Sequence, residues 1–287
     1  IGSAAECYYK YTVNVTVTDI AAPTAPSPPA SVCYNGIGSV TLPFTATPSA
    51  SPAGNTIEWF DAASGGTSLG TGNSLSIAGF VPTGPYPQTV TRYAETVTAD
   101  GCCRSVSRTA VNVIINQAPT ITASANSPAC EGGTILLTST PSNTLGSPTY
   151  NWDSPTASNI STLQNPAGFT ATATSGGTYT VTVTNGSNTC TASATTALVV
   201  YPRPVATATS NTPVCVGSNI ALTGGASSGT TPYNFSWTGP NTYAVDGQSP
   251  LPFAATAAAA GTYTVTVSDS KGCSSTSAAT VAVNTPP

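Results

Sequence analysis

The clearest pattern in the chain is an alternation of apolar residues and threonines in residues 177–184. Tyr179, Val181 and Val183 are separated by single threonines, so one face of the segment is apolar and the other is polar. A period of two predicts a half-buried β-strand. An Asn-Gly pair follows, and then a cysteine and a second alternating segment at 192–200. We expect a β-hairpin here, because Asn-Gly between two strand-like runs favours a tight turn.

Two further copies of this hairpin lie elsewhere in the chain. Residues 261–273 repeat the alternation and end in a cysteine, and residues 91–102 hold a looser copy in which Tyr93 corresponds to Tyr179. Each hairpin is preceded by a cysteine, a glycine-containing turn, a strand-like segment and a tryptophan. The first cysteines of the last two copies lie 85 residues apart (215 − 130), and each lies 22 residues before its tryptophan (152 − 130 and 237 − 215). About seven short strands per copy predict a β-sandwich that is repeated in tandem.

The repeats divide the chain into three predicted modules and the segments that flank them. The predicted bounds are 1–20 for an orphan strand of the kind that ends a module, 21–30 for a Pro-rich linker, 31–116 for module 1, 120–201 for module 2, 205–284 for module 3 and 285–287 for the start of another linker. We expect an all-β chain of tandem sandwiches joined by short Pro-rich spacers, as a window on a longer array or one unit of a polymer. Residues 254–260 are helix-like, but the Gly261 that follows favours a loop or an irregular strand.

Nearly all of residues 31–284 resembles repeats of large surface proteins from bacteroidete-type bacteria. Modules 2 and 3 resemble the PKD-like and Ig-like repeats through Cys-x-Gly, an aromatic residue two positions before Trp152 and Trp237, and Gly-Thr-Tyr-Thr-Val-Thr-Val before the second cysteine. Module 1 resembles the related Ig-like repeat through residues 57–66 and 69–72. The resemblance implies tandem Ig-like β-sandwiches at the cell surface, where such modules serve as stalks, adhesin arms and enzyme appendages.

Composition narrows the class of protein further. Charged residues make up 6% of the chain, against roughly 25% in an ordinary soluble domain. An apolar content of 39% and a net charge of −4 argue against disorder. Six Lys and Arg residues provide no basic surface for nucleic acid. No apolar run approaches the roughly 20 residues that span a bilayer. We therefore expect an extracellular protein with no nucleic-acid partner and no transmembrane segment.

Eight cysteines and no histidine favour disulfides in an oxidising compartment over a metal site. Register within each module predicts the pairs Cys33–Cys102, Cys130–Cys190 and Cys215–Cys273. Each of the last two pairs closes a loop of about 60 residues, which the chain-entropy treatment values at roughly 4 kcal/mol. Such staples suit sandwiches whose small cores are only marginally stable alone.

Two cysteines remain after this pairing, Cys7 and Cys103. One interpretation is a bridge between them that attaches the orphan strand to module 1. The other is that one of them bridges to a neighbouring subunit, because Cys102 and Cys103 are adjacent on the chain and point to opposite faces of a strand. Free thiols are the third alternative.

The orphan strand suggests a mechanism of assembly. Tyr11, Val13, Val15 and Val17 alternate with polar residues, and a strand edge of this kind can pair with the sheet of another subunit. We therefore consider strand exchange that builds a head-to-tail filament. The alternative is that this segment only completes a preceding module.

Other candidate residues favour structural roles. Trp59, Trp152 and Trp237 could stack on sugars, but their shared register predicts the core tryptophan of a sandwich. Asp61, Asp153 and Asp246 lie after the tryptophans without the Asp-x-Asp-x-Asp-Gly spacing of a calcium loop, so we expect no metal.

Charged and nucleophilic side chains give no catalytic constellation. Arg92, Arg104 and Arg108 surround Glu95 in the closing hairpin of module 1, which favours cross-strand charge pairs over an anion site. Without histidine, a Ser or Cys nucleophile lacks its usual base. We therefore expect no enzyme activity and no cofactor.

A surface with so few charges tends to associate or to carry sugar. Four Asn-x-Ser/Thr sequons are candidate N-glycosylation sites: Asn14, Asn159, Asn185 and Asn234. The abundance of Ser and Thr makes O-linked sugar the stronger interpretation.

Two functions from different classes agree with these observations. The first is an extracellular structural protein, a tandem Ig-like array that forms the shaft of a filament or adhesin, with other copies of itself as partners. The second is a carbohydrate- or protein-binding region of an adhesin or secreted enzyme.

Overall fold

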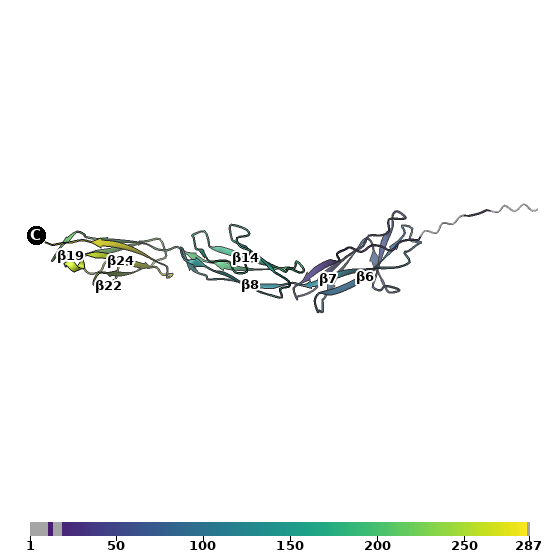
Figure 1. Cartoon of the computed structure of the whole chain (residues 1–287), viewed down its shortest axis with the longest axis horizontal. Helices are drawn as coiled ribbons and strands as arrows, with labels where there is room; N and C mark the ends of the chain where they lie inside the picture. Colours follow the sequence, from purple (N-terminus) through teal and green to yellow (C-terminus); the bar gives the residue numbers. More distant parts are fainter. Residues whose placement is uncertain (1–10, 14–18, 286–287) are drawn as a thin grey trace, which may run out of the picture. The chain divides into compact units, whose positions relative to one another are not determined.

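The computed structural model describes residues 11–13 and 19–285. It divides into two compact units, Ile1–Ala118 and Pro119–Pro287. Both are all-β (Figure 1), and the only helix among the described residues is a single 3-10 turn, η1, at Ala257–Ala259. The predicted fold class, tandem Ig-like β-sandwiches, is confirmed.

The first unit contains a sandwich of seven strands. These are β1 (Ala30–Tyr34), β2 (Val40–Thr45), β3 (Thr56–Phe60), β4 (Ser68–Thr71), β5 (Ser74–Phe80), β6 (Gln88–Val97) and β7 (Thr109–Gln117). One sheet has the order β1-β7-β6-β3-β4, and β2 pairs with β5 in the other. The pair β1–β7 is parallel, whereas the pairs β7–β6 and β6–β3 are antiparallel. The two sheets bury one core between them.

The core of this sandwich is built around Trp59. Its indole is fully buried against Leu42 and Phe44 of β2, whose exposed fractions are also 0%. Its Nε1 donates a hydrogen bond to the carbonyl oxygen of Gly72, 2.8 Å away. The buried N–H is therefore satisfied, as a tryptophan in a core requires.

The second unit begins with the strands of module 2. They are β8 (Thr120–Ala125), β9 (Ala129–Cys130), β10 (Thr134–Ile135), β11 (Leu137–Ser142), β12 (Thr149–Asp153), β13 (Phe169–Thr170), β14 (Gly177–Thr184), β15 (Thr191–Leu198) and β16 (Val200–Tyr201). The three-stranded sheet has the order β12-β14-β15, and β11 pairs with β8. The short strand β9 pairs in parallel with β16, at the point where the chain leaves the module.

Module 3 repeats this arrangement in the same unit. Its strands are β17 (Val205–Ser210), β18 (Val214–Cys215), β19 (Asn219–Ile220), β20 (Leu222–Ser227), β21 (Asn234–Gly239), β22 (Tyr243–Asp246), β23 (Phe253–Ala254), β24 (Gly261–Ser268), β25 (Ser274–Val281) and β26 (Val283–Asn284). The main sheet has the order β22-β21-β24-β25. The stretch 254–260, expected as a loop or irregular strand, contains the end of β23 and the turn η1.

The predicted alternation is confirmed in both hairpins of the second unit. Tyr179, Val181 and Val183 of β14 are buried, and the threonines between them are not. The strand β24 has the same burial pattern. Opposite them, Trp152 and Trp237 are fully buried, as predicted, and their Nε1 atoms donate to the backbone at 3.1 and 3.2 Å. The three tryptophans therefore belong to cores and are not platforms for sugar.

The tyrosines of β14 and β24 fix the corner that precedes each strand. The hydroxyl of Tyr179 donates to Ser175 O and that of Tyr263 to Ala259 O, each at 2.9 Å and four residues upstream. A tyrosine hydroxyl bonded back to the upstream backbone is a known corner of Ig-type sandwiches. Each corner joins the loop rigidly to the core.

The corresponding register in module 1 was predicted wrongly. Trp59 pairs with Ala94, whereas Trp152 and Trp237 pair with the middle valines of β14 and β24. Counting back two residues from Ala94 leads to Arg92, not Tyr93. Because side chains alternate along a strand, a slip of one residue places Tyr93 on the other face.

Part of the N-terminal segment lies among the described residues. Residues 11–13 have no strand structure, and Tyr11 and Val13 are 84% and 78% exposed. Val15, Val17, Asn14 and Cys7 lie outside the described residues. The expected strand at 11–17 is therefore not present in its first three residues.

Candidate functional site

A disulfide joins modules 2 and 3. Cys130, at the end of β9, is bonded to Cys273, in the turn between β24 and β25, with 5.6 Å between their Cα atoms. The predicted pairs Cys130–Cys190 and Cys215–Cys273 are therefore wrong. The reason is geometric: the cysteine that lies close to Cys130 in space is in the closing hairpin of module 3, not in the closing hairpin of module 2. The bond crosses a module boundary instead of closing one module.

The backbone around Cys130 is fixed on both sides. Glu131 N donates to Tyr201 O at 2.8 Å, which continues the β9–β16 pairing, and Gly133 N donates back to Cys130 O at 2.9 Å. Gly132 N reaches Ala171 O at 2.8 Å. The turn needs a glycine there, because Gly132 has a φ of +79°. These bonds hold Cys130 at the end of the module where the chain also exits.

The hairpin that carries Cys273 is organised by one carboxylate. Asp269 is 4% exposed; its Oδ1 accepts hydrogen bonds from the amides of Lys271 and Cys273, each at 2.9 Å, and its Oδ2 accepts from Thr230 N at 3.0 Å. Desolvation acts to raise the pKa of Asp269, but the amides of Thr230, Cys273 and Lys271 outweigh it and lower the pKa. The ionised carboxylate therefore stabilises the loop that presents Cys273.

The linker between the two modules adds polar contacts to the disulfide. Arg203 donates from Nε and Nη2 to Ser274 O, at 3.0 and 2.8 Å. Lys271 Nζ lies 5.3 Å from the centroid of the Tyr201 ring, within the range of a cation–π contact. Neither contact was predicted from the sequence. The only signal available was Arg203, the single charged residue of the Tyr-Pro-Arg-Pro linker.

The remaining cysteines fall into bonded and free groups. Cys33 and Cys190 are disulfide-bonded, and the described free thiols, all exposed, are those of Cys102, Cys103 and Cys215. The predicted Cys33–Cys102 bridge is therefore wrong. A bridge from Cys7 to Cys103 is also contradicted, since Cys103 is free, and Cys7 itself lies outside the described residues.

The two adjacent thiols of module 1 are not equivalent. Cys102 Sγ donates to Asp100 Oδ2 at 3.0 Å and lies 3.3 Å from Cys103 Sγ. The hydrogen bond to Asp100 is the largest cause that raises the pKa of Cys102 to about 11. The same bond is the largest cause that lowers the pKa of Asp100 to about 2. Cys102 therefore stays a thiol at neutral pH, and a thiol is a poor nucleophile.

Two of the three arginines of module 1, Arg104 and Arg108, form ion pairs, as predicted. Arg104 contacts Glu58 and also lies 3.4 Å from Glu95, and Arg108 lies 3.5 Å from the same Glu95 oxygen. The pKa of Glu58 is lowered by a hydrogen bond from Ser68 and by Arg104, against the effect of burial. Arg92 belongs to a different environment, 5.9 Å from the ring centroid of Phe44.

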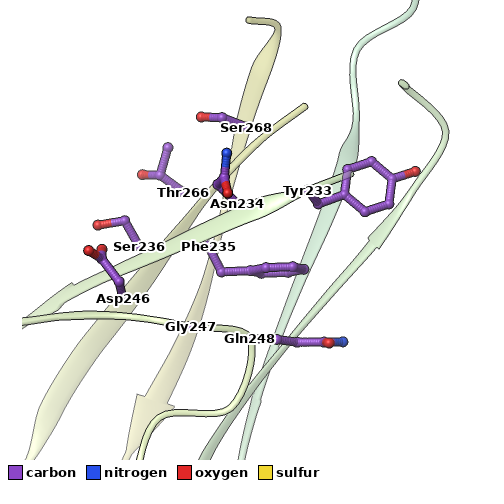
Figure 2. A pocket seen from close by; sticks show the side chains of 9 residues that line it. All are labelled: Tyr233, Asn234, Phe235, Ser236, Asp246, Gly247, Gln248, Thr266 and Ser268. Atoms are coloured by element: carbon purple, nitrogen blue, oxygen red, sulfur yellow. The ribbon is translucent and has the colours of Figure 1, made fainter. Parts of the chain in front are cut away.

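A pocket of about 480 Å³ lies on the β21–β22 side of module 3. Ser236 faces Asp246 and Thr266 in the strand registers, and Figure 2 shows these three side chains on one side of the sheet. Phe235 and Gln248 also line the pocket. Hydroxyl groups and a single carboxylate suit hydrogen bonding to a polar ligand.

The other predicted site residues lie apart. Asp61 Oδ1 accepts from Thr67 N at 2.7 Å, and Asp153 Oδ1 accepts from Asn159 N at 2.7 Å, so each organises its own loop. Among residues 11–13 and 19–285, no cluster of three or more His, Cys, Asp or Glu side chains is suited to a metal ion. Over the same residues, no helix is long and apolar enough to cross a membrane.

The sequons differ in accessibility. Asn159 and Asn234 are exposed. Asn185 is only 1% exposed, and its side-chain oxygen accepts a hydrogen bond from Leu145 N at 3.0 Å. The prediction of a glycan at Asn185 is therefore wrong, because the folded hairpin leaves its amide no access to sugar.

Comparison with solved structures returns tandem Ig proteins. A three-Ig fragment of titin is 14% identical and covers 93% of this chain and 97% of its own, with a TM-score of 0.41. The three N-terminal domains of the Hoc outer capsid protein of bacteriophage RB49 are 14% identical over 88% of this chain and 96% of theirs, with a TM-score of 0.32. Extracellular domains 3–5 of Drosophila OTK are 12% identical over 92% of this chain and 100% of that chain, with a TM-score of 0.34.

Comparison with curated sequences and family models finds a match for module 1 and the linker before it. No curated protein sequence matches the chain. Residues 21–116, which hold the Pro-rich linker and module 1, match the family model described as the Ig-like domain CHU_C associated.

Proposed function

We propose that this chain is an extracellular structural protein, an array of Ig-like modules that forms the shaft of a filament or surface adhesin. The observation that carries the proposal is the bond between Cys130 and Cys273, because it fastens one module to the next. Together with the Arg203–Ser274 hydrogen bonds it makes the junction more than a flexible linker. Structural disulfides persist in oxidising compartments, which supports the extracellular location.

Pulling a single chain from its two ends tests this role. With the disulfide intact, the 143-residue separation between Cys130 and Cys273 cannot lengthen when the modules unfold. At roughly 3.5 Å per residue, this segment measures about 500 Å when fully extended, and a reductant makes it available to the pulling force. The double variant C130S/C273S, in which the disulfide of Cys190 remains, lengthens more than the parent without reductant and less than the parent with reductant. Traces that are the same with and without reductant contradict a mechanical role for the junction.

The filament itself is tested by electron microscopy of the native material. Linear or helical assemblies are expected. Monodisperse single particles would contradict polymerisation. Head-to-tail pairing of the N-terminal segment with the sheet of a second copy is the route we propose, supported by the exposed apolar side chain of Val13. A variant that lacks residues 1–20 then stays monomeric in sedimentation velocity, whereas the full chain forms larger species.

A second candidate function is binding of a carbohydrate at the pocket of module 3. The observation that favours it is the set of hydroxyl and carboxylate groups of Ser236, Asp246 and Thr266 on one side of the sheet. Such groups can hydrogen-bond sugar hydroxyls. Glycan-array binding that is lost in D246A and kept in D153A supports this function, and an array without signal contradicts it.

A further inference from the structure

The cysteines of the three modules occupy two structural positions. The first is the short strand that pairs in parallel with the end of the module, and it holds Cys33, Cys130 and Cys215. The second position is the turn of the closing hairpin, and it holds Cys103, Cys190 and Cys273. In each case the cysteine carbonyl oxygen accepts a hydrogen bond from a backbone amide just after the preceding strand. The disulfide between modules 2 and 3 joins one cysteine of each position.

Cys215 reproduces the surroundings of Cys130. Val216 N donates to Asn284 O at 3.0 Å, which corresponds to the bond from Glu131 to Tyr201. Ser218 N donates back to Cys215 O at 3.0 Å, as Gly133 does to Cys130. Gly217, with a φ of +89°, takes the place of Gly132 in the turn. Cys215 therefore lies beside the last strand of module 3, where the chain leaves the module, just as Cys130 lies beside the last strand of module 2.

Cys103 reproduces the surroundings of Cys273. Thr98 N donates to Cys103 O at 3.0 Å, and Thr98 Oγ1 accepts from Cys103 N at 3.1 Å. Asp269 makes the same reciprocal pair with Cys273, at 2.9 Å in both directions. Cys102 has no counterpart in the other hairpins and was wrongly predicted to hold this position. The hairpin register selects Cys103.

Bonding separates the members of each position, and in the hairpin position burial separates them as well. Cys33, Cys130, Cys190 and Cys273 are disulfide-bonded. The two bonded hairpin cysteines, Cys190 and Cys273, are 0% and 1% exposed. In contrast, Cys103 and Cys215 are exposed free thiols. Among the described residues, one cysteine of each position thus lacks the bond that its equivalents make.

We propose that Cys215 of one copy forms a disulfide with Cys103 of a second copy, which repeats between chains the junction seen between modules 2 and 3. The inference rests on the proposed role as an array of linked modules and adds a covalent link to it. The second copy then continues the array from the end of module 3.

The chemistry is thiol–disulfide exchange with a small or protein disulfide as oxidant. One cysteine thiolate attacks the oxidant and forms a mixed disulfide, and one thiolate leaves. The thiolate of the other copy then attacks the cysteine sulfur of that mixed disulfide and displaces the second thiolate. Two cysteine thiols and one disulfide become one intermolecular disulfide and two thiols. Cys102, whose pKa is raised by Asp100, stays protonated and does not compete at neutral pH.

Oxidation of the purified chain with oxidised glutathione tests the proposal. We expect a ladder of covalent multimers on a denaturing gel without reductant, which collapses to monomer when reductant is added. Peptide mapping of the ladder is expected to identify the Cys103–Cys215 cross-link. The variants C103S and C215S each lose every species larger than a monomer. Mixed together they form dimers and nothing longer, since each supplies one of the two cysteines. The matched controls C7S and C102S keep the ladder.

Several outcomes overturn the inference. They are a ladder that persists in C103S or C215S, symmetric Cys215–Cys215 dimers of C103S, a ladder lost in C7S, or a Cys102–Cys103 bond in the oxidised chain. The gel also separates this inference from polymerisation by strand addition. Assemblies held by strands alone dissociate in detergent whether or not reductant is present, whereas disulfide-linked multimers survive detergent without reductant.

Discussion

Cys130 and Cys273 are 143 residues apart in the sequence and 5.6 Å apart between their Cα atoms. Each is held in place by its own backbone hydrogen bonds, at the start of module 2 and in the closing hairpin of module 3. The bond therefore links two rigid elements and not two loops. It makes the stability of the second unit depend on redox conditions, and the following predictions test that dependence and its supports.

Loss of the junction disulfide destabilises the second unit. In the chain-entropy treatment, a closed loop of the 143-residue separation contributes at most about 5 kcal/mol. The double variant C130S/C273S is expected to unfold at lower urea concentration than the parent without reductant. It should match the parent once reductant is present. C215S, which removes only a free thiol, is the control and is expected to leave the midpoint unchanged.

The stability contributed by Asp269 depends on pH. The folded-state pKa of this carboxyl lies below its ordinary value of 3.8, because three backbone amides outweigh the effect of burial. Its contribution is therefore complete above that value and is lost as the pH falls through the folded pKa. D269N is expected to lower the melting temperature at pH 7 and to reduce its fall on acidification. A melting temperature that falls equally in D269N and the parent contradicts this account.

The linker arginine contributes to the junction through its planar fork. R203K keeps the charge but loses the paired bonds from Nε and Nη2 to Ser274 O. We expect R203K to cost about 1 kcal/mol in unfolding of the second unit. R203A should cost at least as much. If R203K unfolds like the parent, the two hydrogen bonds do not stabilise the junction.

Two arginines of module 1 should differ strongly in their effect on stability. Arg108 is 14% exposed, lies over the Phe60 ring at 3.3 Å and donates to the carbonyl oxygens of Ala62 and Gly65. Arg104 is 46% exposed, so solvent screens its ion pairs. We expect about 2 kcal/mol of destabilisation from R108A and less than about 1 kcal/mol from R104A in urea unfolding. The reverse order contradicts this assignment.

Removing the hydroxyl of either corner tyrosine is expected to cause a small loss of stability that is local to its corner. Y179F and Y263F each remove a 2.9 Å hydrogen bond to a carbonyl oxygen four residues upstream, and leave the ring in the core. Each is expected to cost about 1 kcal/mol. Y93F is the matched control, because Tyr93 lies on the other face of β6. Hydrogen exchange at residues 174–176 and 257–260 should quicken in the first two variants and not in the control.

Local sequence was sufficient to predict the strands of the hairpins and which face of each strand is buried. The alternation at Tyr179, Val181 and Val183 predicted a half-buried strand, and the shared register of the tryptophans predicted three cores. The first rests on a period of two, which any half-buried strand must obey, and the second on the repeated position of tryptophan in each module. The copy in module 1 was aligned wrongly by one residue at Tyr93, because loops of different length hide the register that strand pairing sets.

The pairing of the cysteines was decided by tertiary structure. The repeated position of the cysteines within each module favoured Cys130 with Cys190. The packing of module 3 against the linker brings Cys273 to Cys130 instead. Whether two thiols meet depends on the placement of whole modules, and no local pattern of residues encodes that placement. The same reason explains the buried amide of Asn185, which carries a sequon that only the folded hairpin hides.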